Sequence, residues 1–118
     1  MAYVLIIDDS EFALDFIKEM VIEAGHRVAA TTNPAEFMEL AEALPTPDLA
    51  MVDSVMPEVT GPELIARLRQ HPRPGLANMP VILASALEDQ NIPYEGVLLL
   101  AKPFGPEELG QAFRLALG

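Results

Sequence analysis

The sequence predicts an α/β fold built on a parallel sheet with helices on both faces. Short apolar segments alternate along the chain with segments of helical periodicity, which is typical of parallel strands joined by right-handed crossovers. The apolar segment before Asp53 is continuous rather than alternating, as expected of a strand buried on both faces. Charged or hydroxyl side chains directly follow four of the apolar segments. Ligands bind at the carboxyl ends of strands in open α/β sheets, so these side chains are candidate site residues.

Length and composition restrict the class of protein. With 118 residues, 12.8 kDa and no cysteine, the chain is predicted to be one domain, residues 1–118, that needs neither disulfides nor a thiolate site. Its net charge of −11 at pH 7 disfavours direct binding to nucleic acid or to anionic membranes, which depends on Lys and Arg. No basic residue precedes the first apolar segment, and Asp8 and Asp9 interrupt it early. We therefore expect no signal peptide, no spanning helix and a cytoplasmic location, either as a stand-alone domain or within a longer protein.

The first strand and helix are predicted at the amino terminus. Tyr3–Ile7 is apolar and β-branched, and it ends in Asp8 and Asp9. Ser10 is a plausible N-cap, and the helix that follows is expected to end at Gly25. The apolar residues expected to face the sheet are Ala13, Ile17, Met20, Val21 and Ala24.

A weaker strand and a second helix follow. Arg27–Thr31 is the strand, and Asn33 with Pro34 and Glu36 forms a helix start with a cap, a proline at the first position and an acid in the first turn. The prolines within residues 45–47 end this helix. Its inward side chains are expected to be Phe37, Leu40, Ala41 and Leu44.

The third strand, residues 48–53, delivers Asp53 at its carboxyl end. Asp also favours turns, so taken alone Asp53 is as well explained by a turn as by a functional site. Thr60 opens a third helix, and residues 71–79, which are rich in proline and glycine, are predicted to form a loop. The third helix is expected to turn Leu64, Ile65 and Leu68 inward.

Two more strands and a last helix complete the chain. Residues 80–84 form a strand that ends in Ser85, and residues 96–101 form one that ends in Lys102. The stretch between Ser85 and Lys102 is too short for a strand and a helix of average length, so the fourth helix is predicted to be short or irregular. The last helix starts near Pro106 and is expected to bury Leu109, Ala112, Phe113 and Leu117.

The polar residues that end these strands are expected to meet at one edge of the sheet. Asp8, Asp9 and Asp53 would repel one another there unless a cation neutralised them, and carboxylate oxygens suit Mg²⁺. The ammonium of Lys102 and the hydroxyl of Ser85, facing such a cation, would form a pocket for a phosphoryl group.

Four sets of residues occur in the order and at about the spacing of a known family. They are Ile6 to Asp9; Asp53 with Met56, Pro57 and Gly61; Ser85 with Ala86; and Lys102 with Pro103 and Phe104. Over its whole length the chain resembles a receiver domain of the two-component response-regulator family, of the chemotaxis-regulator type. The resemblance implies a flavodoxin-like, doubly wound sheet of five parallel strands in the order 2-1-3-4-5.

The resemblance also implies a function and a set of roles. Asp53 would be the phosphoacceptor, taking a phosphoryl group from a sensor histidine kinase or a phosphotransfer protein in a domain that catalyses its own phosphorylation and dephosphorylation. Asp9 and Asp53, with the backbone carbonyl of Val55, would bind Mg²⁺, and Asp8 would act through a water. Two further residues would bind the phosphoryl oxygens and sense the modification, namely Lys102 and Ser85.

Several positions depart from the family pattern. Leu99 occupies the place of the usual aromatic or histidine that reads out phosphorylation, and Tyr94 lies nearby without matching it. Val55 and Leu87 stand two residues beyond Asp53 and Ser85, where the family often has polar groups that hold the hydrolytic water, so we expect slow loss of the phosphate. Phe12, an apolar residue beside the acidic pair on the outward side of its helix, is a candidate for partner docking.

Two other functions are alternatives to a phosphorylated receiver. A degenerate receiver would act as a phosphorylation-independent interaction module, but such domains usually lose an acid or the lysine, and both are present here. A haloacid-dehalogenase-like phosphatase would need a second aspartate two residues after the first, where this chain has Ser10 after Asp8.

Overall fold

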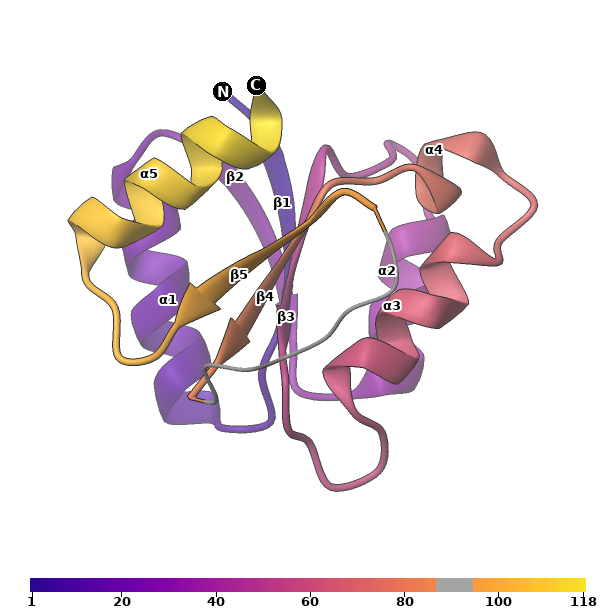
Figure 1. The fold of residues 1–118 in the computed structure, drawn as a ribbon, viewed down its shortest axis with the longest axis horizontal. Helices are drawn as coiled ribbons and strands as arrows, with labels where there is room; N and C mark the ends of the chain where they lie inside the picture. Colours follow the sequence, from indigo (N-terminus) through magenta and orange to yellow (C-terminus); the bar gives the residue numbers. More distant parts are fainter. Residues whose placement is uncertain (87–94) are drawn as a thin grey trace.

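The computed structural model describes the chain except for residues 87–94, and its centre is one parallel sheet of five strands in the order β2-β1-β3-β4-β5 (Figure 1). The strands are β1 (Tyr3–Ile7), β2 (Arg27–Thr31), β3 (Leu49–Asp53), β4 (Val81–Ser85) and β5 (Val97–Ala101). The helices of the described residues are α1 (Glu11–Glu23), α2 (Pro34–Glu42), α3 (Gly61–Arg69), α4 (Pro74–Ala77) and α5 (Pro106–Leu117). The predicted fold class and strand order are confirmed.

Local capping explains where three helices begin. The Ser10 side chain accepts a hydrogen bond from the Ala13 amide at 3.2 Å, and the Asn33 side chain accepts one from Glu36 at 3.0 Å. Thr60 caps α3 in the same way, accepting from the amide of Glu63 at 3.2 Å. Each cap satisfies an amide that has no partner inside its helix, so these starts could be predicted from the sequence.

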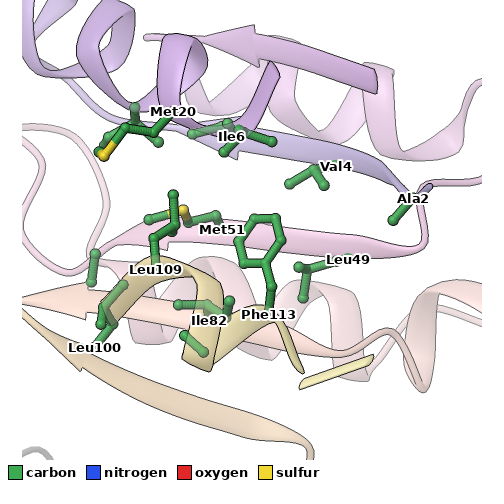
Figure 2. Close-up of a cluster of buried hydrophobic side chains, with 14 of the residues drawn as sticks. Ala2, Val4, Ile6, Met20, Leu49, Met51, Ile82, Leu100, Leu109 and Phe113 are labelled. Carbon is green, nitrogen blue, oxygen red and sulfur yellow. The ribbon is translucent and has the colours of Figure 1, made fainter. Parts of the chain in front are cut away.

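The helices cover the two faces of the sheet in separate groups. Helices α1 and α5 lie on one face, and α2, α3 and α4 lie on the other (Figure 1). Each face has its own buried apolar cluster, because the side chains of a strand alternate between the two faces. Figure 2 shows the cluster under α1 and α5, whose members include Val4, Ile6, Met20, Leu109 and Phe113.

Four side chains lie differently from their predicted positions. Leu14 is buried although it was not expected to face the sheet, and Ala24, expected inward, is exposed because it lies past the last turn of α1. Leu44 was also expected inward, but it follows the end of α2 and is 80% exposed. Leu117 ends α5 and is likewise exposed. Ala24, Leu44 and Leu117 lie at or beyond helix ends, where the helical period no longer determines direction. Leu14 instead lies inside α1, on the buried face that it shares with Ile17 and Val21 three and seven residues further on.

The predicted loop at residues 71–79 contains the four-residue helix α4, which corrects the sequence prediction. Pro74 stands at its first position, where the missing amide costs nothing, and the turn buries Leu76 against the α2–α3 side. The predicted short or irregular fourth helix between β4 and β5 falls on residues 87–94, outside the described residues. In the part of the chain that is described, every helix is too short or too polar to cross a membrane.

Candidate functional site

Three strands, β1, β3 and β5, deliver charged side chains to one edge of the sheet. Asp8 follows the end of β1 and Asp53 ends β3, and the pairing of Ile7 with Val52 puts the two aspartates at the same level. Lys102 follows β5 directly. The predicted meeting of these residues at the carboxyl edge is therefore observed.

The carboxylates and the lysine form one contact network. The Lys102 ammonium lies 2.8 Å from an Asp53 carboxylate oxygen and 3.4 Å from an oxygen of Asp8. One oxygen from each of Asp8, Asp9 and Asp53 lies within 4.8 Å of the others. Asp8 is 2% exposed and Asp53 is 7% exposed, whereas Asp9 faces solvent. Two buried acids thus contact a single ammonium, and the accessible carboxylate of Asp9 lies close to both acids.

Backbone contacts hold Asp8 in place. One Asp8 carboxylate oxygen accepts the Ser10 amide at 3.0 Å, and the Asp8 amide donates to the Thr31 carbonyl at 3.3 Å. Thr31 is a buried residue that the sequence analysis did not single out. The signal available in the sequence was its position as the polar last residue of the second strand.

Gly61 lies against the backbone of the Asp53 segment. A Cβ atom at Gly61 would stand 2.5 Å from the Asp53 carbonyl oxygen and 2.7 Å from the side chain of Leu83. The Gly61 amide donates to the Ser54 carbonyl at 2.9 Å. No other residue type fits without moving the strand end, so this glycine lets α3 start directly beneath the site.

Burial dominates the electrostatics of Asp53 and Lys102. Burial raises the pKa of Asp53, the negative charge of Asp8 raises it further, and the Lys102 hydrogen bond only partly opposes them. Burial by itself would lower the pKa of Lys102, but its hydrogen bond to Asp53 and the charges of both aspartates outweigh that effect, so its pKa is raised. The Lys102 ammonium therefore stays charged at neutral pH. The negative charges of Asp8 and Asp53 beside it repel each other.

The donor set of the site fits a hard divalent cation. Three aspartates offer oxygens close to one another, and the negative charge of Asp8, which adds to the effect of burial on the pKa of Asp53, is a repulsion that a cation relieves. One lysine cannot neutralise three carboxylates. The residues present thus suit Mg²⁺ better than they suit a soft metal, which would require sulfur or imidazole ligands.

The other predicted site residues lie at different distances from this network. Ser85 ends β4, is buried, and accepts the Lys102 amide through its carbonyl at 2.9 Å, so it lies at the same edge. The side chain of Val55 is 66% exposed, beyond the buried acids, and Phe12 is exposed on α1. Leu87 and Tyr94 lie outside the described residues.

Comparison with known proteins finds one family model that matches most of the chain. The model is that of the response regulator receiver domain, and it matches residues 4–114. Among curated proteins, the chain is 30% identical to the chemotaxis protein CheY of Thermotoga maritima over 115 residues, which cover 92% of each protein. It is 31% identical to the transcriptional regulatory protein GltR of Pseudomonas aeruginosa, of which the match covers 45%.

Solved structures give the same result. The structure of the chemotaxis response regulator CheY4 of Vibrio cholerae matches with a TM-score of 0.84 and 26% identity, covering 99% of each chain. The receiver domain of the Francisella response regulator 1452 matches with a TM-score of 0.80 and 29% identity, covering 98% of this chain and 97% of that one.

Proposed function

Because the chain belongs to the response regulator receiver family, we propose that it is a phosphorylation-controlled switch in which Asp53 accepts the phosphoryl group. Receiver domains of two-component systems act in phosphoryl-acceptance signalling and interact with histidine kinases or phosphotransfer proteins. The observation that carries the assignment to Asp53 is its contact with the Lys102 ammonium at 2.8 Å inside the aspartate cluster. The switch is proposed to work in the cytoplasm.

The transfer itself requires little covalent machinery. An Asp53 carboxylate oxygen attacks the phosphorus of a phosphohistidine, and the new O–P bond forms as the P–N bond breaks in line with it. The electron pair of the broken bond stays on the imidazole nitrogen, and because the other ring nitrogen of the phosphohistidine already carries a proton, the imidazole leaves as a neutral group. What the chain contributes is position and charge, because the transition state spreads negative charge over the phosphoryl oxygens.

Lys102 supplies part of that charge. Its ammonium contacts Asp53 and Asp8 at the edge of the sheet, so a short movement brings it to a phosphoryl oxygen on Asp53. A lysine whose pKa is raised remains cationic throughout the transfer. The transfer thus converts one carboxylate–ammonium pair into a phosphate–ammonium pair without leaving a buried charge alone.

Receiver domains bind Mg²⁺ at an acidic pocket, which corresponds here to the cluster of Asp8, Asp9 and Asp53. In our proposal, Asp9 and Asp53 hold the ion together with the Val55 backbone carbonyl, and Asp8 acts through a water. When bound, Mg²⁺ neutralises charge between the aspartates and the phosphoryl oxygens.

The switch residue in this proposal is Ser85. Its position at the end of β4 supports a hydrogen bond from its hydroxyl to a phosphoryl oxygen, which would bias a two-state surface. Leu99 on β5 stands where the family usually has the aromatic readout residue, and its side chain is partly exposed. We therefore propose that the output does not depend on an aromatic at this position.

Loss of the phosphate is proposed to be slow. Val55 offers no hydrogen bond to a hydrolytic water, and Leu87, which lies outside the described residues, offers none either. A tenfold change in rate corresponds to about 1.4 kcal/mol of barrier, which one water contact can supply. Val55→Asn and Leu87→Glu should each speed the decay of the phosphoprotein in Mg²⁺, and loss of the wild-type phosphate within seconds would contradict the argument.

Phosphorylation by a small donor tests the proposed function directly. With Mg²⁺ and phosphoramidate, wild-type protein should gain one phosphoryl mass, Asp53→Asn should gain none, and the exposed control Glu39→Gln should behave as wild type. Absence of an adduct on wild type would favour the phosphorylation-independent module instead. Turnover of phosphate esters would favour a phosphatase.

Calorimetry tests the metal separately. Asp53→Ala should weaken Mg²⁺ binding because it removes one of three clustered carboxylates, and Glu39→Gln should leave it unchanged. Equal affinity in wild type and Asp53→Ala would exclude Asp53 as a ligand. A beryllofluoride phosphoryl mimic should bind only when Mg²⁺ is present.

Docking of the donor protein is proposed to involve Phe12. This side chain is 87% exposed and lies two residues after the α1 cap, at the edge that carries Asp53. Phe12→Ala should slow transfer from a donor protein and leave phosphorylation by phosphoramidate unchanged.

A further inference from the structure

We propose that His26 is a pH-sensitive link between the start of β1 and helix α5. The neutral ring connects the two, and protonation of the ring breaks its contact with the residue before β1. The inference does not involve phosphorylation, so it stands apart from the proposed function. Three observations carry it: the hydrogen bond that His26 accepts from a backbone amide, the contact of its ring with Phe113, and its place on two grooves that are open to solvent.

The backbone fixes the protonation state of one ring nitrogen of His26. The amide of Ala2 lies 3.0 Å from Nδ1 of this ring. A backbone amide can only donate, so Nδ1 accepts the hydrogen bond and carries no proton. A neutral imidazole has one protonated nitrogen, which here must be Nε2. In the charged ring both nitrogens are donors, so Nδ1–H would face the N–H of Ala2 and the hydrogen bond would be lost.

The same ring contacts the last helix. The ring centroids of His26 and Phe113 are 5.2 Å apart, and the two ring planes are tilted by 45°. Phe113 on α5 and Ala2 both belong to the buried cluster under α1 and α5 (Figure 2). One histidine in the turn between α1 and β2 therefore connects the two ends of the chain across this cluster.

His26 is one of two side chains that hold the start of β1. The Tyr3 amide, next along the chain, donates to an Asp48 carboxylate oxygen at 2.8 Å. Histidine is the side chain that ordinarily changes its charge between pH 5 and 8, whereas a carboxylate oxygen stays an acceptor there. A moderate fall in pH therefore removes one of the two side-chain acceptors and leaves the other.

Solvent reaches the ring through two grooves. The groove between α1 and α5 has a volume of about 800 Å³, and its walls include Met20 on α1, His26, and Leu109, Gly110, Phe113 and Arg114 on α5. A second groove, of about 450 Å³, lies between His26 and the residues Met1, Ala2 and Asp48. Because His26 lines both grooves and is partly exposed, a proton can reach it without unfolding of the domain.

No nearby carboxylate offsets the charge of a protonated His26. The charged groups around the two grooves and the turn are Glu23 on α1, Arg27 at the start of β2, Arg114 on α5, Asp48, the Met1 amino group and the Gly118 carboxylate. Among the residues that the structure describes, none of the acids forms an ion pair with His26. Protonation thus removes a hydrogen bond at Nδ1 and gains no ion pair at Nε2.

The second histidine of the chain differs in this respect. Nδ1 of His71 also accepts a backbone amide, that of Arg73, at 3.1 Å. Its Nε2, however, lies 2.9 Å from a Glu42 carboxylate oxygen, and this contact becomes an ion pair when the ring is charged. The gain at Nε2 opposes the loss at Nδ1, so His71 is a natural control for His26.

The link has a defined sign. The folded protein keeps Nδ1 of His26 free of a proton, whereas the unfolded chain can take one up, so stability falls as the pH falls through the range in which histidine titrates. The charged ring has to turn before its new N–H finds water, and turning changes its tilt on Phe113. Acid is therefore expected to free the Ala2 amide and to alter the wall of the groove between α1 and α5.

NMR of the wild-type protein tests the link directly. At about pH 8, Nδ1 of His26 should have the ¹⁵N chemical shift of an unprotonated nitrogen, and Nε2 that of a protonated one. As the pH is lowered to about 5, the Ala2 amide signal and the Phe113 ring signals should shift together with the His26 ring signals. Protection of the Ala2 amide from hydrogen exchange, corrected for the intrinsic effect of pH, should fall about fivefold, as expected for the loss of one hydrogen bond.

An asparagine separates the hydrogen bond from the titration. In His26→Asn the side-chain oxygen stands at the position of Nδ1, one bond beyond Cγ, and accepts the Ala2 amide in neutral and in acid solution. Between about pH 7.5 and pH 5.5, the Tm of wild type should fall about 4 °C further than that of His26→Asn. His71→Asn is the matched control, and it should keep the wild-type acid response of Ala2 and Phe113.

Three results would overturn the proposal. They are a proton on Nδ1 of His26 at about pH 8, a His26 titration that leaves the Ala2 amide signal in place, and an equal loss of Tm in acid for wild type and His26→Asn. The first two come from wild-type protein and do not depend on the folding of a variant.

Discussion

The two faces of the sheet are packed differently. On the face covered by α2, α3 and α4, Phe37, Leu64 and Leu68 are completely shielded from solvent. On the other face, Met20 and Phe113 keep partial contact with solvent beside the groove between α1 and α5. Neighbouring elements shield the first face from solvent, whereas the second face is open to solvent along the groove between α1 and α5.

Arginine side chains account for part of this difference. Arg73 donates to the Glu42 carbonyl at 2.8 Å and so joins the residue before α4 to the end of α2. Arg69 donates to the carbonyls of Ala77 at 3.2 Å and Glu95 at 2.9 Å. Arg114, on the open face, has no such contact among the described residues and lines the groove instead. One face is thus closed by these contacts, and the other keeps a groove that is open to solvent.

The largest expected difference in stability between the two faces is between truncations of one phenylalanine on each face. Phe37→Ala should cost about 4 kcal/mol of unfolding free energy, since the cavity has no access to water. Phe113→Ala should cost about 1 kcal/mol less, because the groove lets solvent or side chains enter. Urea unfolding measures both values, and equal losses would contradict the distinction between the faces.

The arginines provide an intermediate effect. Arg73→Leu removes the donor for the Ala41 and Glu42 carbonyls and should cost about 1–2 kcal/mol. Arg114→Leu, on the open face, should stay within about 0.5 kcal/mol of wild type. Thermal unfolding of both variants measures the two losses of stability. A larger loss for Arg114→Leu than for Arg73→Leu would contradict the view that the arginines on the α2–α3–α4 face contribute more to stability.

Glycine substitutions should change stability in opposite directions. Gly110→Ala lies in a helix with free space around it and should stabilise the protein by about 1 kcal/mol. Gly25→Ala should destabilise it by about 1–2 kcal/mol, because φ is +95° at this helix end. A stability loss in Gly110→Ala would mean that the groove is less open than the structure indicates.

The smallest expected effect is the pH dependence of the start of α5. The Gly105 amide donates to the Glu108 carboxylate at 2.8 Å and lowers the pKa of this exposed acid. A lowered pKa means that the contribution to stability is present above the ordinary pKa of glutamate and is lost as the pH falls through the lowered value. Compared with wild type, Glu108→Gln should show a flatter loss of stability in acid. Identical acid unfolding curves would show that this cap contributes nothing.

The sequence by itself determined the order of the elements and the edge at which the site assembles. Strand and helix periods differ, so Tyr3–Ile7 and the helix after Ser10 could be recognised locally. Parallel strands end at a common edge of the sheet. Because Asp8, Asp53 and Lys102 each stand at the carboxyl end of a strand, their proximity could be predicted, and the structure shows it. From the sequence, the assignment of Asp53 as phosphoacceptor rested on the family resemblance, and the contact of Asp53 with Lys102 is what supports the proposal in the structure.

Other features depend on distances between elements that are remote in the chain, and these could be seen only in the tertiary structure. The period of α1 could not show that Ala24 is exposed, since that depends on where the helix ends above the sheet. The 2.5 Å approach of a Cβ at Gly61 to the Asp53 carbonyl depends on how β3 leads into α3. The groove likewise depends on how α1 and α5 are placed relative to each other, because residues of both helices line it. Local periodicity specifies which side of an element is apolar, but the spacing between two packed elements is fixed by the whole core between them.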